Sequence, residues 1–440
     1  MKTNPQIQFA SLEEIKQYQE ALLREQIIYL AKYSPFYQKL FAREKINPSL
    51  IRRIEDLSSI PTTSKTDLQN QNEQFLCVPR SEISDFVTTS GTLGEPVTFA
   101  VTNSDLERLA YNEELSFSTA GCRPGDIFQL MTTIDRRFMA GLAYFLGARK
   151  LGCGIARVGN GIPELQWDTI RRIQPSVCIV VPSFLLKLVQ YAQSHGIDPQ
   201  KSSLRRAICI GEALRSPGPD YHLSTLGERI TQQWPGLELF STYASTEMQT
   251  SFTECSQHAG GHIPPELIIV ELLDEQEQPV SENTPGEVTI TTLGVQGMPL
   301  LRFKTGDICC FTSEPCRCGR NTPRLSSLLG RKKQMIKYKG TTLYPPALFN
   351  ILNEIAGIQN YIIDVSTNEL DTDSITLRIA SPRQDEAFIK EIKDLFRSRI
   401  RVAPEIIFES SEKISSLQFP PMSRKPIFFR DLRKPIEILK

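Results

Sequence analysis

A loop rich in hydroxyl side chains and glycine has the composition of a phosphate-binding loop. It spans residues 88–98, between short apolar runs at 83–87 and 97–101 that predict two strands. The residues expected to contact phosphate are Ser90, Gly91, Thr92 and Gly94. Small residues let the backbone close around an anion, so that N–H groups and hydroxyls can donate hydrogen bonds to its oxygens. An ordinary polar hairpin turn has the same composition, so the loop alone leaves both interpretations open.

Four more segments follow the loop in chain order and carry charged or aromatic side chains suited to a nucleotide. They are Ile210-Gly211-Glu212-Ala213-Leu214, Thr242-Tyr243-Ala244-Ser245-Thr246-Glu247, Arg302-Phe303-Lys304-Thr305-Gly306-Asp307 and Leu329-Gly330-Arg331-Lys332-Lys333. Together with the loop, this series resembles the signature motifs of the adenylate-forming superfamily of acyl- and aryl-CoA ligases. The resemblance is greatest to the phenylacetate–CoA ligase branch and runs from about residue 86 to the C-terminus. Each motif alone is common, whereas the five in this order are specific.

The resemblance implies that the protein joins a carboxylic acid to ATP, forming an acyl-adenylate and pyrophosphate, before a thiol displaces AMP. The loop at 90–94 would hold the β and γ phosphates, and Gly211 with Glu212 would line the adenine site. Tyr243 would stack on adenine, and Thr246 would bond the α-phosphate. A plain strand end that leads into a capped helix is the alternative for the tyrosine-containing motif.

Three charged residues complete the implied nucleotide site. Glu247 would ligate a Mg²⁺ ion that bridges the phosphates, since a carboxylate suits a hard cation. Asp307 would accept hydrogen bonds from both ribose hydroxyls, and Arg331 would contact the ribose or the phosphates. A Thr-Gly-Asp turn without function is the alternative for the segment that ends at Asp307.

A lysine near the C-terminus supplies the adenylating cation in the resembled family. Lys425 matches it, because Asp431 follows six residues later as the family pattern requires. Arg424, Lys434 or a merely solvated basic tail are the alternatives. The departures from the family pattern include a small one, Ala244 in place of glycine, and four others: Leu93, Glu95, Arg424 and Pro426. These four residues are the support for a different class of function, a nucleotide-binding protein that has lost catalysis.

The apolar pattern predicts an α/β protein of two domains. From 86 to 300, short apolar runs alternate with amphipathic stretches, which favours mostly parallel sheets between layers of helices, with an antiparallel segment at 267–292. A compact β-α-β-β-α-β unit follows. We therefore expect a large N-terminal adenylate-forming domain over 1–332 and a small, mobile α+β domain over 333–440. By resemblance, Lys333 is the hinge and Gly340 lines the tunnel for the pantetheine of coenzyme A.

A group of soft metal ligands lies outside the nucleotide motifs. Cys255 and His262 form one pair, and Cys316 with Cys318 forms another far along the chain. Three thiolates and one imidazole make a closed tetrahedral Zn²⁺ site, and relatives in the resembled branch carry a similar pattern, which favours His262 over His258. Because four protein ligands leave no open position, we expect a structural role. Unliganded reduced cysteines are the alternative.

Composition limits the compartment and the partners. The 440 residues hold 50 Lys and Arg and 50 Asp and Glu, so the overall charge does not call for nucleic acid or an anionic membrane. The N-terminus has no apolar signal core, and no stretch approaches the roughly 20 apolar residues of a membrane span. We expect a cytoplasmic protein, in which Cys178 and Cys209 are small core residues.

The function that the sequence supports is an ATP-dependent carboxylate–CoA ligase, with an aromatic acid by resemblance to the branch. The acid pocket should include part of 132–160 and the turn at 181–184, where Arg136 and Arg137 are either a solvated turn or contacts to a second polar group of the acid. Transfer to the phosphopantetheine of an acyl carrier protein instead of coenzyme A is the alternative. The branch is often dimeric, which implies a homodimer only by analogy.

Overall fold

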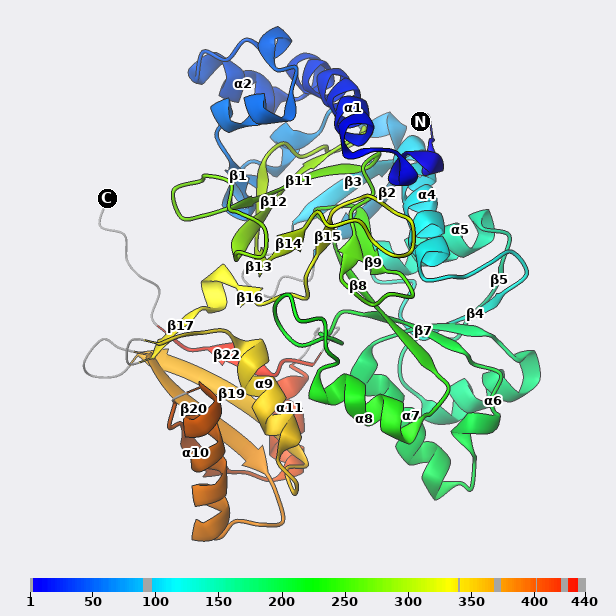
Figure 1. The fold of residues 1–440 in the computed structure, drawn as a ribbon, viewed down its shortest axis with the longest axis vertical. Helices are drawn as coiled ribbons and strands as arrows, with labels where there is room; N and C mark the ends of the chain where they lie inside the picture. The colour runs from blue at the N-terminus through cyan, green and yellow to red at the C-terminus, as the bar shows by residue number, and fades with distance from the viewer. Residues whose placement is uncertain are drawn as a thin grey trace. The chain divides into compact units, whose positions relative to one another are not determined.

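The structure is a computed structural model, shown as a ribbon in Figure 1. It describes residues 3–89, 97–338, 341–367, 373–400, 402–420 and 426–433, and the side chains at 333, 337, 338, 341 and 342 are not part of the description. The chain divides into two compact units, Met1–Leu328 and Leu329–Lys440. The predicted boundary between functional domains, at 332/333, stays a prediction.

The first unit begins with two helices, α1 (Leu12–Tyr33) and α2 (Pro35–Arg43). Ser11 caps α1 through a capping box with Glu14, and Pro35 starts α2 directly after the first helix ends. The helices bury an apolar stripe spaced by three and four residues, which includes Leu23, Ile27 and Leu30. This stripe packs into the same core as the first β-sheets of the unit.

A nine-stranded sheet forms the centre of the first unit, in the order β14-β15-β10-β9-β8-β7-β6-β4-β5. The strands are β4 (Ile127–Leu130), β5 (Gly154–Arg157), β6 (Val177–Val180), β7 (Arg206–Ile210), β8 (Glu238–Ser245), β9 (Thr250–Glu254), β10 (Gly261–His262), β14 (Phe311–Thr312) and β15 (Arg324–Leu325). Strands β4 to β8 pair in parallel, and β8 turns back antiparallel into β9. Cys178 and Cys209 are buried within it, and the predicted α/β class is confirmed.

Two smaller sheets complete the first unit. One contains β1 (Thr63–Ser64), β13 (Phe303–Cys309), β12 (Gly286–Thr292) and β11 (Ile268–Leu273), and the other is the hairpin of β2 (Ile83–Thr88) and β3 (Thr98–Thr102). The predicted antiparallel pairing at 267–292 is confirmed, because β11 pairs antiparallel with β12. The remaining helices are α3 (Lys65–Asn70), α4 (Asn103–Thr119), α5 (Met139–Lys150), α6 (Pro163–Ile173), α7 (Pro182–Ser194) and α8 (Thr225–Gln233).

The second unit holds its own four-stranded sheet in the order β21-β20-β19-β22. Its elements are β16 (Gly330–Arg331), β17 (Ile336–Tyr338), β18 (Thr341–Leu343), α9 (Pro345–Glu354), β19 (Asn360–Thr367), β20 (Asp373–Ala380), α10 (Glu386–Ile400), β21 (Glu405–Phe408), α11 (Ser411–Gln418) and β22 (Phe429–Asp431). The buried carboxylate of Asp364 binds both Arg378 and Arg430 across the sheet. The predicted strand and helix order is found, except that the hairpin of β17 and β18 replaces a single strand before α9, and α11 and β22 are added.

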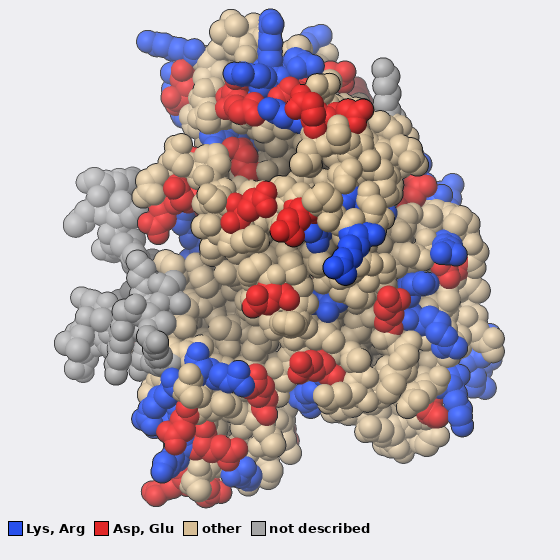
Figure 2. Space-filling view, viewed as in Figure 1, with Lys and Arg blue, Asp and Glu red and all other residues tan. Residues whose placement is uncertain are grey.

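Charged side chains of both signs alternate over the face shown in Figure 2. This distribution matches the equal numbers of basic and acidic residues in the sequence. Among the described residues, no helix combines the length and apolar character that a membrane crossing requires.

Candidate functional site

The structure brings together two of the predicted nucleotide residues from distant motifs. The phenol of Tyr243, near the end of β8, donates a hydrogen bond of 2.7 Å to the carboxylate of Asp307 on β13. Burial, more than the nearby carboxylate, raises the pKa of Tyr243, so the phenol stays protonated and can donate. An aromatic ring and a carboxylate thus lie side by side, as stacking on a base and binding of a ribose require.

Other residues of the Asp307 motif are held by structural ion pairs. Arg302 forms a two-point pair with Glu271 at 3.1 and 3.0 Å and is almost fully buried. Lys304 binds Glu277 at 3.0 Å and Glu287 at 3.5 Å. These pairs fix the strand that presents Asp307, so the cations of this motif serve the fold.

A lysine that the sequence analysis did not assign lies beside the predicted magnesium ligand. The ammonium of Lys65 is 3.7 Å from the carboxylate of Glu247. Strand β1 pairs with β13, with Ser64 opposite Lys304, so Lys65 follows directly from the strand next to the Asp307 motif. Lys65 is the first residue of α3, where the helix dipole disfavours a cation. A lysine at this unfavourable position was the sequence signal that could have indicated a functional role.

Glu212 takes part in a helix cap. Its carboxylate accepts hydrogen bonds from the backbone N–H of Ser183 at 2.9 Å and from the Ser183 hydroxyl at 2.8 Å. Ser183 lies in the first turn of α7, so the carboxylate satisfies that N-terminus. Gly211 has φ of 76°, a conformation that favours glycine, and turns the chain after β7. The predicted adenine-site turn and the predicted acid-pocket turn are therefore linked by Glu212.

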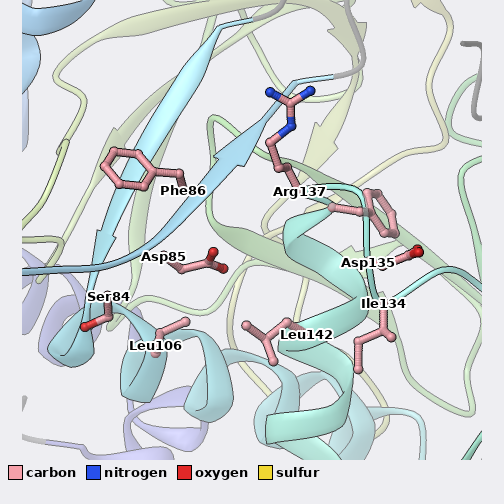
Figure 3. A pocket seen from close by; sticks show the side chains of 9 residues that line it. Ser84, Asp85, Phe86, Leu106, Ile134, Asp135, Arg137 and Leu142 are labelled. Carbon is pink, nitrogen blue, oxygen red and sulfur yellow. The ribbon is translucent and has the colours of Figure 1, made fainter.

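A pocket of about 440 Å³ lies between β2, α4 and the segment before α5 (Figure 3). Its lining residues are Ser84, Asp85, Phe86, Leu106, Ile134, Asp135, Arg137, Phe138 and Leu142. Five of them come from the predicted acid-pocket stretch 132–160, whereas the turn at 181–184 does not line this pocket. In Figure 3 the side chains of Asp85, Leu106 and Leu142 converge, while the guanidinium of Arg137 points away from them.

A turn of two consecutive arginines lies at the edge of this pocket, which Arg137 lines. Arg136 and Arg137 have φ of 57° and 58°, a left-handed conformation that costs free energy in bulky residues. The carbonyl of Arg137 accepts a hydrogen bond of 3.0 Å from the N–H of Thr88, at the end of β2. The strained turn therefore holds the acid-pocket stretch against the strand that leads toward residue 90.

The four predicted zinc ligands form one cluster. Their ligand atoms all lie within 4.8 Å of one another, with 3.6 Å between the sulfurs of Cys255 and Cys316. The Cys318 sulfur is 3.5 Å from Nε2 of His262. Tetrahedral zinc with ordinary bond lengths separates two sulfurs by about 3.8 Å and sulfur from nitrogen by about 3.6 Å. The donor set and its spacing therefore fit zinc.

The surroundings of the cluster support the histidine as a ligand. Nδ1 of His262 is 2.8 Å from the buried hydroxyl of Thr322, which leaves Nε2 for a metal. Burial lowers the pKa of His262, so the imidazole is neutral as a ligand must be. Burial alone would raise the pKa of Cys318, but its contacts with His262 and Arg320 outweigh burial and lower the pKa to about 5.

The loop that carries Cys316 and Cys318 contacts the N-terminal segment of the chain. The N–H of Asn321 donates to the carbonyl of Gln8 at 2.9 Å, and Arg320 donates to the Gln8 side chain at 3.1 Å. The Arg320 guanidinium also lies 5.2 Å from the ring centre of Phe9. The loop after the two cysteines thus connects residues from the two ends of the first unit.

Several predicted residues fall outside these contacts. Ser90, Gly91, Thr92, Gly94, Gly340 and Lys425 lie outside the described residues. Arg331 and Lys333 belong to the second unit, in β16 and the short 3-10 helix Lys332–Gln334. Thr246 lies in the turn after β8. Their predicted roles stay predictions.

The comparison with known families agrees with the site. The AMP-binding enzyme family matches residues 17–297, a range that includes Lys65, Tyr243 and Glu247. The chain belongs to this family. It is 29% identical to the phenylacetate–coenzyme A ligase of Thermus thermophilus, over 89% of this chain and 86% of the relative. It is 25% identical to that of Aromatoleum evansii, over 91% of each. The predicted membership of the adenylate-forming superfamily, in its phenylacetate–CoA ligase-like branch, is confirmed.

Solved structures share the fold. A 2-hydroxyisobutyryl-CoA ligase in its postadenylation state has a TM-score of 0.83 at 22% identity, over 97% of this chain and 91% of that one. An anthranilate CoA ligase bound to anthranoyl-AMP has a TM-score of 0.59 at 17% identity, over 80% of this chain and 67% of that one. At these identities the likeness establishes the fold alone.

Proposed function

We propose that this AMP-binding enzyme uses the Tyr243–Asp307 and Lys65–Glu247 pairs to make an acyl-adenylate and then a coenzyme A thioester. The protein is an ATP-dependent, AMP-forming acid–CoA ligase, in line with its family and its phenylacetate–CoA ligase relatives. The observation that carries the residue assignment is the 2.7 Å bond between Tyr243 and Asp307, which joins two motifs of the series.

In the first step a carboxylate oxygen of the acid forms a bond to the α-phosphorus of ATP. The bond from that phosphorus to the β-phosphate oxygen breaks, and pyrophosphate leaves with the electron pair. Tyr243 and Asp307 hold the adenosine, and Lys65 supplies a positive charge near the phosphates. Lys425, by the family pattern, supplies the second cation. A Mg²⁺ ion held by Glu247 would neutralise charge on the phosphate oxygens.

Lys65 compensates for a departure in the phosphate loop. The sequence has Glu95 where the family usually has lysine, which removes a cation beside the phosphates. Lys65, at the start of α3, lies 3.7 Å from Glu247, the proposed magnesium ligand. Lys65 can therefore supply a positive charge near the phosphates in place of the missing loop lysine. This placement argues against the degenerate nucleotide-binding protein as the function.

In the second step the sulfur of coenzyme A attacks the acyl carbon, the bond to the AMP oxygen breaks, and the thiol proton passes to water. Gly340 would line the tunnel through which the pantetheine of coenzyme A approaches. Lys333 would be the hinge about which the C-terminal domain moves between the adenylate-forming and the thioester-forming arrangement. Transfer to a carrier-protein phosphopantetheine would follow the same chemistry. An aromatic acid, a homodimer and a cytoplasmic location remain predictions.

We propose a structural zinc ion at Cys255, His262, Cys316 and Cys318. Four protein ligands at tetrahedral spacing leave no open position for substrate. The ion would join the end of β9 and strand β10 to the loop of Cys316 and Cys318, which contacts the N-terminal segment. It would thereby stabilise the first unit.

The test of the reaction is ATP–pyrophosphate exchange without a thiol, across aryl and short acyl acids. We expect exchange with at least one aromatic acid, and thioester formation when coenzyme A is added. Lys425→Ala should abolish the exchange. Full exchange in that variant would remove Lys425 from the site, and silence across the whole panel would argue for the degenerate protein. Adding a carrier protein in place of coenzyme A tests the alternative acceptor.

A further inference from the structure

A buried arginine on α4 binds backbone groups from three separate segments of the first unit. Arg108 is 1% exposed, and its guanidinium donates to the carbonyls of Leu267 at 2.6 Å and Leu293 at 2.7 Å. It also donates to the carbonyl of Gln249 at 2.7 Å and to the Thr250 hydroxyl at 3.2 Å. Burial lowers the pKa of Arg108 to about 10, so the side chain stays charged at neutral pH. Hydrogen bonds from a charged donor are stronger than neutral ones, so Arg108 fixes the three segments firmly.

One of these segments is the turn that carries Glu247, the proposed magnesium ligand. Ser245 accepts the N–H of Met248 with its hydroxyl at 3.3 Å and the N–H of Gln249 with its carbonyl at 3.2 Å. Gln249 ends the turn with φ of 49°, a left-handed conformation that costs free energy in a residue with a side chain. Because Arg108 binds the carbonyl of this residue, it stabilises a strained backbone two residues after Glu247.

The same arginine joins the two sheets that carry the proposed nucleotide residues. The turn of Glu247 connects β8 to β9 in the nine-stranded sheet. Leu267 and Leu293 instead lie directly beside the paired ends of β11 and β12, in the other sheet. Strand β12 pairs with β13, which carries Asp307. Arg108 therefore fixes the turn of Glu247 relative to the sheet of Asp307.

We infer that Arg108 is a positioning residue, which holds the turn of Glu247 so that its carboxylate can bind a Mg²⁺ ion on the phosphates of ATP. The inference rests on the proposed ligase function and on Glu247 as the magnesium ligand. One carboxylate is sufficient, because Mg²⁺ at nucleotide sites takes its other ligands from phosphate oxygens and water. The Glu247 side chain keeps 14% of its surface exposed, whereas Arg108 is enclosed and acts through the backbone that it binds.

The test is calorimetric titration of ATP into the wild type and variants, once with Mg²⁺ and once with EDTA in its place. For the wild type we expect Mg²⁺ to strengthen ATP binding by at least about tenfold, since the ion links Glu247 to the phosphates. In Arg108→Met, which removes every hydrogen bond of the guanidinium, this gain should fall to less than about threefold. Arg108→Lys keeps the charge but can bind fewer carbonyls, so it should show an intermediate gain.

A matched control separates positioning from general damage to the fold. Arg324 is 6% exposed and also binds backbone carbonyls, those of Ala259 at 2.7 Å and Glu314 at 3.0 Å. Arg324→Met should lower the unfolding temperature, as Arg108→Met does, but keep the full gain from Mg²⁺. Unfolded protein lowers the number of binding sites and leaves the ratio of the two affinities unchanged, so the ratio reports the position of Glu247. Where Arg108→Met does not fold, Arg108→Lys carries the test, with a gain less than about half that of the wild type.

A Glu247→Gln variant distinguishes failure of the inference from failure of the proposed function. If Glu247→Gln loses the gain from Mg²⁺ while both Arg108 variants keep it in full, the inference is wrong and the ligase function stands. A wild type without the gain, or a Glu247→Gln variant that keeps it, would overturn the magnesium assignment and the inference with it. A wild type that binds no ATP in either condition and exchanges pyrophosphate with no acid would overturn the ligase function itself.

Discussion

The proposed zinc ligands and the proposed nucleotide residues of the first unit differ in how their side chains are arranged. The four metal ligands converge within 4.8 Å and face one another, and Thr322 and Arg320 support them. The nucleotide residues instead form two pairs, Tyr243 with Asp307 and Lys65 with Glu247. In the proposed assignment the four ligands hold a structural ion, whereas Tyr243, Asp307, Lys65 and Glu247 bind the nucleotide and its metal. We therefore expect substitutions at the proposed zinc ligands to change zinc content and stability, and substitutions at the proposed nucleotide residues to change ATP–pyrophosphate exchange.

The largest effect is expected from breaking the metal cluster. Cys316→Ser should reduce zinc from about one equivalent to less than about one tenth, and it should lower the free energy of unfolding by several kcal/mol, roughly 3–5, because the metal stabilises the fold. Residues 4–10 should lose protection from hydrogen exchange, since the cysteine loop grips Gln8 and Phe9. Elemental analysis and exchange mass spectrometry measure both. Cys153→Ser, outside the cluster, is the control, and a zinc-replete Cys316→Ser protein would contradict the assignment.

The next effect is expected at the ribose acceptor. Asp307→Ala should lower kcat/KM for ATP in pyrophosphate exchange by about 100-fold, equal to about 3 kcal/mol, while zinc content stays at the wild-type value. The carboxylate is lost both to the ribose and to Tyr243. Asp198→Ala, on an exposed turn, should behave as wild type. If Asp307→Ala exchanges at more than about a third of the wild-type rate, the motif is only a turn.

A smaller effect is expected from the cation beside Glu247. Lys65→Ala should reduce exchange by about tenfold and weaken ATP binding, because a positive charge near the phosphates is removed. Lys65→Arg should restore part of the activity by returning the charge. Lys39→Ala, whose ammonium binds Gln74 on the surface, is the matched control. Equal activity of Lys65→Ala and Lys39→Ala would show that Lys65 only pairs with Glu247.

The smallest effect is expected from removing the hydroxyl group of Tyr243. Tyr243→Phe keeps the ring for stacking and removes the hydrogen bond to Asp307, so the KM for ATP should rise about threefold with little change in kcat. Tyr243→Ala should cost more, because the ring is also lost. If the phenylalanine and alanine variants are equally impaired, the ring does not stack on the base and the hydroxyl alone matters.

The features that depend on contiguous residues could be predicted from the sequence. Motifs such as residues 242–247 and 302–307 are contiguous, so their order could be read directly. The Cys-x-Cys pair and the pair of Cys255 with His262 predicted four residues that the structure brings together. The unit after residue 333 was predicted because its apolar periodicities are regular. Helix α11 was missed because it is short and serine-rich, with only Ile414 and Gln418 buried. Strand β22 has three residues inside a basic run.

Contacts between distant segments could not be predicted in the same way. Lys65 and Glu247 lie far apart in the sequence, and no local pattern encodes their contact. The left-handed turn at Arg136 and Arg137 was also unexpected, because such turns usually carry glycine or asparagine.

The most direct test of the account is calorimetric titration of ATP with Mg²⁺ into the wild type and Asp307→Ala, each carrying its zinc. The account predicts one site on the wild type and affinity at least about tenfold weaker in the variant, with zinc content and the unfolding temperature unchanged. Equal affinity in the two proteins would contradict it, because the Tyr243–Asp307 pair would then not hold the nucleotide.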